Sequence, residues 1–302
     1  MEKILISSSP TGEEFPLPSR ADYQAEFERL KTLAAEQRKS GKQIVVVVGL
    51  GFVGAVMAAV VADSTDKKGR STKFVIGVQR PSTRSYWKIP LLNRGVSPVK
   101  AEDPEVEELI KRCVKDKKTM VATYTEEALK LADVVVVDVQ CDYLKESLGN
   151  VRTGSAEMAA LEASMATIAE NIPPTALVLI ETTVAPGTTE QVAYPIMKKI
   201  FKKRGIRSEP LLAHSYERVM PGRHYVASIR DFWRVCSGVN TTSRKLVTQF
   251  LNDVLHTDSS RSRCWIAPLS RRPPKSSRTA TAPPSWRSWT SGRSLPSATA
   301  LT

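Results

Sequence analysis

Between residues 43 and 258 the chain alternates short apolar runs with longer segments of helical periodicity. The runs are rich in valine, isoleucine and leucine, as is typical of strands that are buried on both faces. Strands separated by helices predict a parallel sheet covered by helices on both sides. The apolar runs are 43–48, 73–78, 119–124, 132–139, 176–184, 209–215 and 232–239, and the helical segments are 55–64, 104–115, 126–132, 156–171, 188–204 and 243–255.

The segment before residue 43 has a different pattern. Residues 1–20 are rich in serine and proline and predict no regular structure. Residues 21–39 place Tyr23, Phe27 and Leu30 at helical spacing, with charged residues between them. We therefore expect residues 1–42 to be an N-terminal extension that contains one amphipathic helix.

The segment after residue 258 changes again, in charge as well as in pattern. The whole chain of 302 residues has a formal net charge of +13. The last 44 residues contribute eight basic and no acidic side chains, and half of them are serine, threonine or proline. This composition predicts a disordered or irregular basic tail at 259–302. Most of the basicity lies in this tail, so the globular part at 43–258 is not expected to bind nucleic acid.

The fold expected from these patterns is α/β, a Rossmann-like, doubly wound and mainly parallel sheet followed by the tail. No stretch approaches the roughly 18 consecutive apolar residues that a membrane span needs, and the N-terminus does not read as a signal peptide. We therefore expect a cytoplasmic protein without a membrane partner. The three histidines and four cysteines show no ligand spacing, so no metal is expected.

A glycine motif follows the first apolar run directly and opens a helical segment. In the GxGxxG pattern the first glycine makes a tight turn, the second lets a pyrophosphate approach the backbone, and the third allows close packing of helix on strand. The phosphates are expected at the helix N-terminus, where unpaired N–H groups converge. The alternative is that the glycines serve only a tight turn. The motif residues are Gly49, Leu50, Gly51, Phe52, Val53 and Gly54.

The second strand of such a domain commonly ends in an acid that binds the adenosine ribose. This chain has Gln79 at that place, followed by Arg80. An amide can bind a ribose hydroxyl, whereas the arginine could pair with a 2′-phosphate. These two residues therefore leave the choice between NAD and NADP open.

Two polar loops follow later apolar runs. Thr182 and Thr183 stand at the carboxyl end of one run, and Glu217 and Arg218 follow the next. Doubly wound sheets bind ligands at this edge, so the four side chains are candidates for the substrate side of a site. Each loop could also be an ordinary turn with a surface ion pair.

Taken together, the motifs GLGFVG (49–54), LNRGVSP (92–98), ETTVAPGTT (181–189) and ERVMPG (217–222) resemble the UDP-glucose/GDP-mannose dehydrogenase family. The resemblance covers residues 43–258 and rests on four motifs in matching order. It implies an NAD-dependent oxidoreductase acting on a CH–OH group. Such enzymes oxidise the C6 alcohol of a UDP-hexose or similar nucleotide sugar to a carboxylate, through an aldehyde and a cysteine thioester, and they form homodimers.

The resemblance also implies roles for individual residues. The glycine motif would hold the pyrophosphate, and Gln79 and Arg84 would face the adenosine ribose. Thr183 would orient a catalytic water, and Glu217 would assist proton transfer during thioester hydrolysis. The chain departs from the family at Gln79 and at 139–142, where a Thr-Pro turn is common. The nicotinamide side would be lined by Thr182, Thr183 and Val184, and the substrate would meet Glu217 and Arg218.

The tail does not continue the family pattern, and Cys264 lacks the glycine-rich surroundings of the family's nucleophile. When each codon from Asp258 onward is reread from its third base, the permitted sequences include AKIVENSYRA, which fits the AKxxENxYRA pattern of the family's central helix. In that frame Trp265 followed by Ile266 forces an aspartate. This agreement favours the hypothesis of a frameshift near Ser259, which would leave the chain catalytically incomplete.

Other functions fit parts of the sequence. A genuine basic tail could bind a polyanion, with its tryptophans stacking on nucleic-acid bases, and the globular part would then be a non-catalytic dinucleotide-binding module. Another alternative is a Rossmann dehydrogenase of the hydroxyacid or phosphogluconate type. Binding of NAD, NADP and a short oligonucleotide would separate these alternatives.

Overall fold

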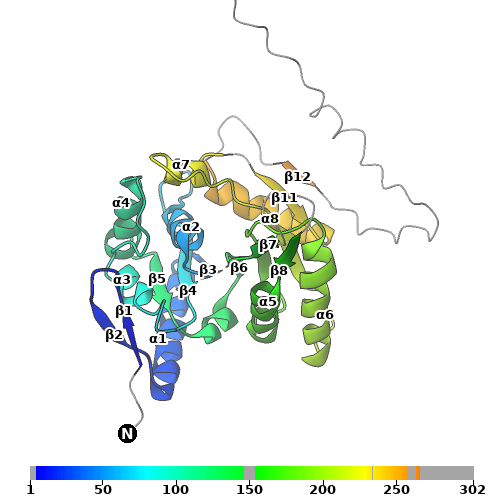
Figure 1. Cartoon of the computed structure of the whole chain (residues 1–302). Helices are drawn as coiled ribbons and strands as arrows, with labels where there is room; N and C mark the ends of the chain where they lie inside the picture. Colours follow the sequence, from blue (N-terminus) through cyan, green and yellow to red (C-terminus); the bar gives the residue numbers. More distant parts are fainter. Residues whose placement is uncertain (1–4, 146–153, 233, 257–262, 266–302) are drawn as a thin grey trace, which may run out of the picture. The chain divides into compact units, whose positions relative to one another are not determined.

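The main sheet of the protein is mainly parallel, as the computed structural model shows (Figure 1). Residues 5–145, 154–232, 234–256 and 263–265 are described. Among them the sheet has eight strands in the order β12-β11-β10-β9-β6-β3-β4-β5, and only the pairing of β10 with β11 is antiparallel. The strands are β3 (Gln43–Val48), β4 (Lys73–Val78), β5 (Met120–Thr123), β6 (Val134–Val137), β9 (Leu177–Ile180), β10 (Leu211–His214), β11 (Val235–Gly238) and β12 (Arg263–Trp265).

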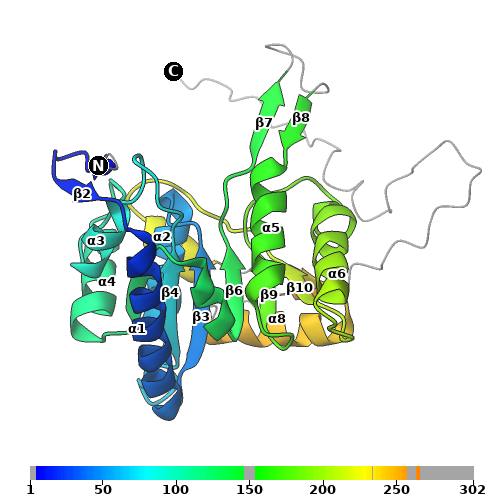
Figure 2. The ribbon, with the colours of Figure 1, turned by 90° about the horizontal axis from the view of Figure 1, so that it is seen from below.

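Helices cover both faces of this sheet, which confirms the predicted α/β, Rossmann-like fold (Figures 1 and 2). The helix after the glycine motif is built almost wholly of small apolar residues, so it packs closely on the strands. One face carries α2 (Phe52–Asp63), α3 (Lys88–Asn93), α4 (Glu105–Lys111) with the π-helical turn η1 (Arg112–Asp116), α7 (Tyr225–Arg230) and α8 (Thr241–Val254). The other carries α1 (Arg20–Lys39), the 3-10 helix η2 (Glu126–Leu131), α5 (Ala159–Asn171), and α6 (Tyr194–Lys203) with the preceding π-helical turn η3 (Thr189–Ala193).

Alternate residues of the central strands fill two separate cores. Val136 of β6 is in register with Leu179 of β9, and Leu179 is in register with Ala213 of β10. These three side chains are buried on the α2 face, whereas their chain neighbours Val135 and Val178 are buried on the α5 face. Because residues in register on parallel strands point to the same side, each row of side chains belongs to one core.

The N-terminal extension is more ordered than its composition predicts. Strands β1 (Ile6–Ser8) and β2 (Glu14–Pro16) form an antiparallel hairpin, so the prediction of no regular structure is wrong for these residues. The buried Ser7 hydroxyl accepts a hydrogen bond from the Trp87 backbone N–H at 3.2 Å, and Phe15 is buried as well. These tertiary contacts stabilise the hairpin, although the local sequence does not favour regular structure. The helix predicted at 21–39 is confirmed as α1, which buries Leu30 and Ala34.

Two short pairings lie where the sequence predicted something else. Strands β7 (Asp142–Lys145) and β8 (Gly154–Glu157) pair with each other in antiparallel fashion, so the helix expected from residue 156 begins only at Ala159. Strand β12 lies parallel to β11 inside the segment predicted to be irregular. The rest of the predicted tail lies outside the described residues.

Candidate cofactor site

The glycine motif forms the turn between β3 and α2. Gly49 has φ +98°, and a Cβ atom there would lie 2.4 Å from the backbone oxygen of Asp138. A Cβ at Gly54 would lie 1.9 Å from the oxygen of Gly49. Both positions therefore admit only glycine. Gly51, the N-cap of α2, is different, because a Cβ there would meet no atom within 4 Å.

The larger residues of the motif fasten this turn to the protein. The side chain of Leu50 is fully buried and packs against Gly77 of β4. The ring of Phe52 stacks on Tyr225 of α7 with 4.8 Å between centroids, and the Tyr225 hydroxyl donates a 2.6 Å hydrogen bond to the Phe52 backbone oxygen. The first turn of α2 is thus held from two sides, while its open end at Gly51 faces free space.

A cavity of about 350 Å³ lies beside this open end. It sits at the carboxyl ends of β3, β4 and β6, the edge at which parallel sheets bind ligands. Its volume is within the usual range for small-molecule sites. Gly49 and Gly51 contribute backbone to its wall, and Gln79, Arg80 and Lys88 contribute polar side chains. Helix α5 closes the cavity with Ala160, Ala163, Ser164, Thr167 and Ile168.

The residues predicted to meet the adenosine ribose lie in different surroundings. The Gln79 side-chain oxygen accepts a hydrogen bond from the Leu50 backbone N–H at 3.0 Å, so this amide also holds the glycine turn. Arg80 forms a long ion pair of 3.7 Å with Glu126, and both side chains are exposed. Arg84 is exposed and is not among the residues that line the cavity.

Lys88 is a polar residue of this site that the sequence analysis missed. Its ammonium nitrogen lies 3.5 Å from the backbone oxygen of Leu50, and the side chain lines the cavity. Burial lowers its pKa. No spacing in the sequence distinguishes this lysine from a surface lysine, because its place depends on how α3 packs beside the glycine turn.

The loops predicted to form the substrate side lie at the same edge of the sheet but outside the cavity. The Thr182 hydroxyl donates a 2.8 Å hydrogen bond to the backbone oxygen of Val139, and Thr183 is exposed. The Glu217 backbone N–H donates to the oxygen of Glu181 at 3.3 Å, which joins the two loops. The Glu217 carboxylate accepts a 2.7 Å hydrogen bond from the Val219 backbone N–H. Val184 is half-buried, and the Arg218 guanidinium lies over the Phe232 ring.

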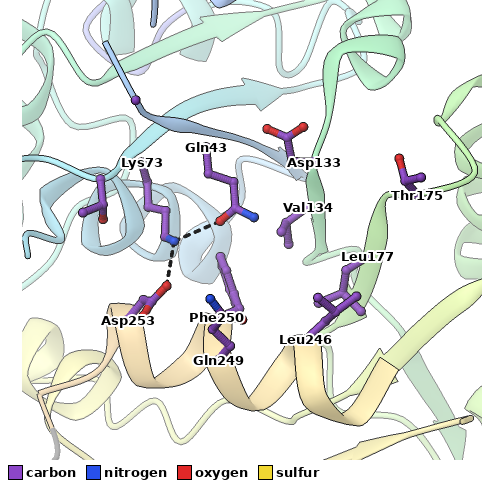
Figure 3. Close-up of a pocket in the computed structure, with 12 residues that line it drawn as sticks. Gln43, Lys73, Asp133, Val134, Thr175, Leu177, Leu246, Gln249, Phe250 and Asp253 are labelled. Atoms are coloured by element: carbon purple, nitrogen blue, oxygen red, sulfur yellow. Dashed lines mark hydrogen bonds and ion pairs between the residues drawn. The ribbon is translucent and has the colours of Figure 1, made fainter. Parts of the chain in front are cut away.

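A second pocket, of about 560 Å³, lies at the opposite edge of the sheet, where the strands begin (Figure 3). The Lys73 ammonium reaches the side-chain oxygen of Gln43 at 2.9 Å and the carboxylate of Asp253 at 3.0 Å. These contacts tie α8 to β3 and β4. Because the glycine turn lies at the other end of β3, this pocket is separate from the cofactor cavity.

The UDP-glucose/GDP-mannose dehydrogenase family, NAD binding domain, matches residues 43–254. The chain belongs to this family. The match confirms the resemblance and the NAD-binding domain that the sequence motifs predicted. No helix among the described residues is long and apolar enough to cross a membrane.

Named relatives are dehydrogenases of several nucleotide sugars. The UDP-N-acetyl-D-mannosamine dehydrogenase of Pyrococcus horikoshii is 28% identical over 203 residues, which is 67% of this chain and 42% of that protein. The GDP-mannose 6-dehydrogenase of Pseudomonas syringae pv. tomato is 30% identical over 161 residues, 53% of this chain and 33% of that protein. The chain thus spans less than half the length of the relatives that it matches.

A solved structure supports the same relationship. The NDP-N-acetyl-D-galactosaminuronic acid dehydrogenase of Methanosarcina mazei Go1 superposes with a TM-score of 0.63 at 29% identity. The superposition covers 78% of this chain and 46% of that one. The fold described here is therefore the fold of the family's NAD-binding domain.

Proposed function

We propose that the chain binds NAD in the cavity beside Gly51 and is the cofactor-binding part of an oxidoreductase that converts the C6 alcohol of a UDP-sugar to a carboxylate. The observation that carries this proposal is the open N-cap of α2. At Gly51 the helix presents its unpaired N–H groups to free space, and a pyrophosphate can approach there without meeting a side chain.

The cavity residues supply the chemistry that a dinucleotide needs. The Lys88 ammonium pairs with a phosphate oxygen, because it lines the cavity and lies 3.5 Å from the Leu50 backbone oxygen of the glycine turn. The Gln79 amide reaches a ribose hydroxyl from the end of β4. Bound NAD would supply the hydride acceptor for oxidation of the sugar alcohol. Thr183 orients a water, Glu217 moves a proton, and Arg218 binds the nucleotide sugar.

We expect NAD to bind more tightly than NADP. Arg80 is the residue available to a 2′-phosphate, and its partner Glu126 lines the same cavity. A 2′-phosphate beside Arg80 would also lie close to the Glu126 carboxylate. Repulsion from the carboxylate would offset the attraction of the guanidinium, so the 2′-phosphate adds little binding free energy.

We expect the 302-residue chain alone to bind NAD without oxidising a UDP-hexose. The family chemistry uses a cysteine thiolate. Cys264 lacks the glycine-rich surroundings of the family's nucleophile, and burial raises the pKa of Cys113 to about 12. We also propose that the coding sequence is read out of frame from about Ser259, and that the full enzyme works in the cytoplasm as a homodimer. Sequencing the coding DNA across this codon in independent isolates tests the frame, and an uninterrupted frame would contradict it.

Calorimetry with NAD tests the cofactor proposal. Gly51→Asp keeps a good N-cap residue, since Gly51 has an ordinary φ of −79°, but it places a carboxylate where the pyrophosphate belongs. We expect this variant to fold and to lose NAD binding. Asn240→Asp adds the same charge at the N-cap of α8 and should bind NAD normally. Equal binding by both variants would contradict the proposal, and salt-sensitive binding of an oligonucleotide would favour the polyanion alternative.

A further inference from the structure

The side-chain row at the carboxyl edge of the sheet is polar where the rows beneath it are apolar. The backbone ladder continues one residue past the strands, because Asp138 N–H donates to Val48 oxygen and Glu181 N–H donates to Val137 oxygen. Ser215 N–H continues the same ladder toward β9. Asp138, Glu181 and Ser215 therefore form one row on the α2 face, two residues beyond the apolar row of Val136, Leu179 and Ala213.

This row contains two acidic side chains, Asp138 and Glu181, and one basic side chain, Arg234, lies beside it. Glu181 and Arg234 are both fully buried and form an ion pair of 2.8 Å. Asp138 has no comparable partner: its Oδ2 atom is buried and has no hydrogen bond among the described residues. The second carboxylate oxygen of Glu181 and the hydroxyl oxygen of Ser215 are likewise buried without a hydrogen-bond partner among the described residues. One buried carboxyl oxygen of Asp138 and one of Glu181 thus lack a hydrogen-bond partner among the described residues, although Arg234 pairs with Glu181.

Asp138 is also the residue on which the glycine turn rests. A Cβ at Gly49 would lie 2.4 Å from the Asp138 backbone oxygen, and a Cβ at Gly54 would lie 3.0 Å from the Asp138 Cβ as well as 1.9 Å from the Gly49 oxygen. The carboxyl group therefore lies directly behind the turn that receives the pyrophosphate. A negative charge at this place would partly cancel the positive electrostatic potential at the N-terminus of α2, and it would repel a bound phosphate.

The charged groups around Asp138 come from every neighbouring element. Glu181 lies on the β9 side, Glu217 on the loop after β10, Tyr225 on α7, and Arg234 before β11. Lys88 faces the cavity that Asp138 also lines. Burial raises the pKa of Asp138 well above its usual range, and Glu181 and Glu217 raise it further against the opposing effect of Arg234. Burial and the two neighbouring carboxyl groups thus act in the direction of the neutral acid.

We propose that Asp138 is a positioning residue of the dinucleotide site, whose carboxyl group must be protonated for the pyrophosphate to bind. The inference rests on the proposed function, because it concerns the same cavity. When the free chain carries an ionised Asp138, binding of the dinucleotide takes up one proton from the solvent, and the Asp138 carboxylate becomes a carboxylic acid. Dinucleotide affinity and proton uptake are then linked.

The test is the dissociation constant of NAD for the full chain, measured by calorimetry from about pH 6 to about pH 9. For the unmodified chain we expect the constant to rise by up to about tenfold per pH unit once Asp138 ionises. Asp138→Asn mimics the neutral acid and should keep the constant within about twofold over the whole range. Asp253→Asn is the matched control at the opposite edge of the sheet, and it should retain the pH dependence.

Two further measurements keep the inference testable if Asp138→Asn folds poorly. Titrations in buffers of different ionisation enthalpy should reveal proton uptake on NAD binding by the unmodified chain at the pH values at which its affinity falls. Glu181→Gln removes one repelling charge, so the loss of affinity should begin at lower pH. The same pH dependence in Asp138→Asn, or no shift in Glu181→Gln, would overturn the coupling alone. Failure of the unmodified chain to bind NAD at any pH would instead overturn the proposed function, and the coupling with it.

Discussion

The side-chain amide of Asn93 makes both hydrogen bonds that a neighbouring strand would make with Ala122 of β5. Its oxygen accepts from the Ala122 backbone N–H at 2.7 Å, and its nitrogen donates to the Ala122 oxygen at 2.9 Å. Strand β5 is the edge of the sheet, and an open edge pairs readily with other chains. The asparagine of the LNRG sequence therefore closes this edge.

Replacing Asn93 by alanine should expose that edge and leave two backbone groups without partners. We expect a loss of about 1–3 kcal/mol in the free energy of unfolding, since unpaired buried polar groups cost about that much. Urea unfolding followed by circular dichroism measures it. Asn252→Ala, at an exposed position of α8, is the matched control and should change little. Equal effects of the two substitutions would show that the amide does not close the edge.

Breaking the buried ion pair should cost more. In Arg234→Met the carboxylate of Glu181 stays buried without its cation, and loss of one partner of such a pair costs about 3–5 kcal/mol. Lys31→Met removes one partner of an exposed pair on α1, where a change of at most about 1 kcal/mol is expected. Thermal unfolding of both variants compares them. Adding Glu181→Gln to Arg234→Met should restore part of the loss, and its failure to do so would argue against an uncompensated charge.

Lys88 should contribute to cofactor affinity without supporting the fold. A charge-assisted hydrogen bond to a phosphate is worth about 1.5–3 kcal/mol, so Lys88→Met should weaken NAD binding by roughly tenfold or more. Lys67→Met removes a charge from an exposed loop and should leave the affinity unchanged. Fluorescence titration with NADH gives both values. Normal affinity in Lys88→Met would remove the lysine from the site.

Stability in acid should depend on Asp63. Burial alone would raise the pKa of this carboxyl group, but hydrogen bonds from Arg112 and Lys117 outweigh that effect and lower it. A lowered pKa in the folded state gives stability that is present above the pKa of the unfolded chain, about 4, and is lost as the pH falls below it. We expect urea unfolding of Asp63→Asn to change less between about pH 5 and about pH 3 than unfolding of the unmodified chain. An unchanged slope would contradict this assignment.

The parts of the fold that depend on local pattern could be predicted from the sequence. The apolar runs that became β3, β4, β6 and β9, and the glycine turn after β3, follow from residue type and spacing alone. The hairpin of β1 and β2 could not be predicted, because it depends on the contact of Ser7 with Trp87, 80 residues away. Lys88 was missed for the same reason, because it lines the cavity only through the packing of α3 beside the glycine turn. Asn93 lies in the LNRGVSP motif, but its hydrogen bonds to Ala122 do not follow from that motif.

The helix that precedes the family's shared region is bonded into that region. The Arg38 guanidinium of α1 donates to the Leu131 backbone oxygen at 2.7 Å and to the Asp133 carboxylate at 2.8 Å. The same carboxylate accepts the Ile44 backbone N–H at the start of β3. Leu30 and Ala34 complete the core on the α5 face. The unit that folds is therefore larger than the region that the family match covers: a protein trimmed to begin at residue 43 would keep every matched residue and lose the helix that covers part of one core.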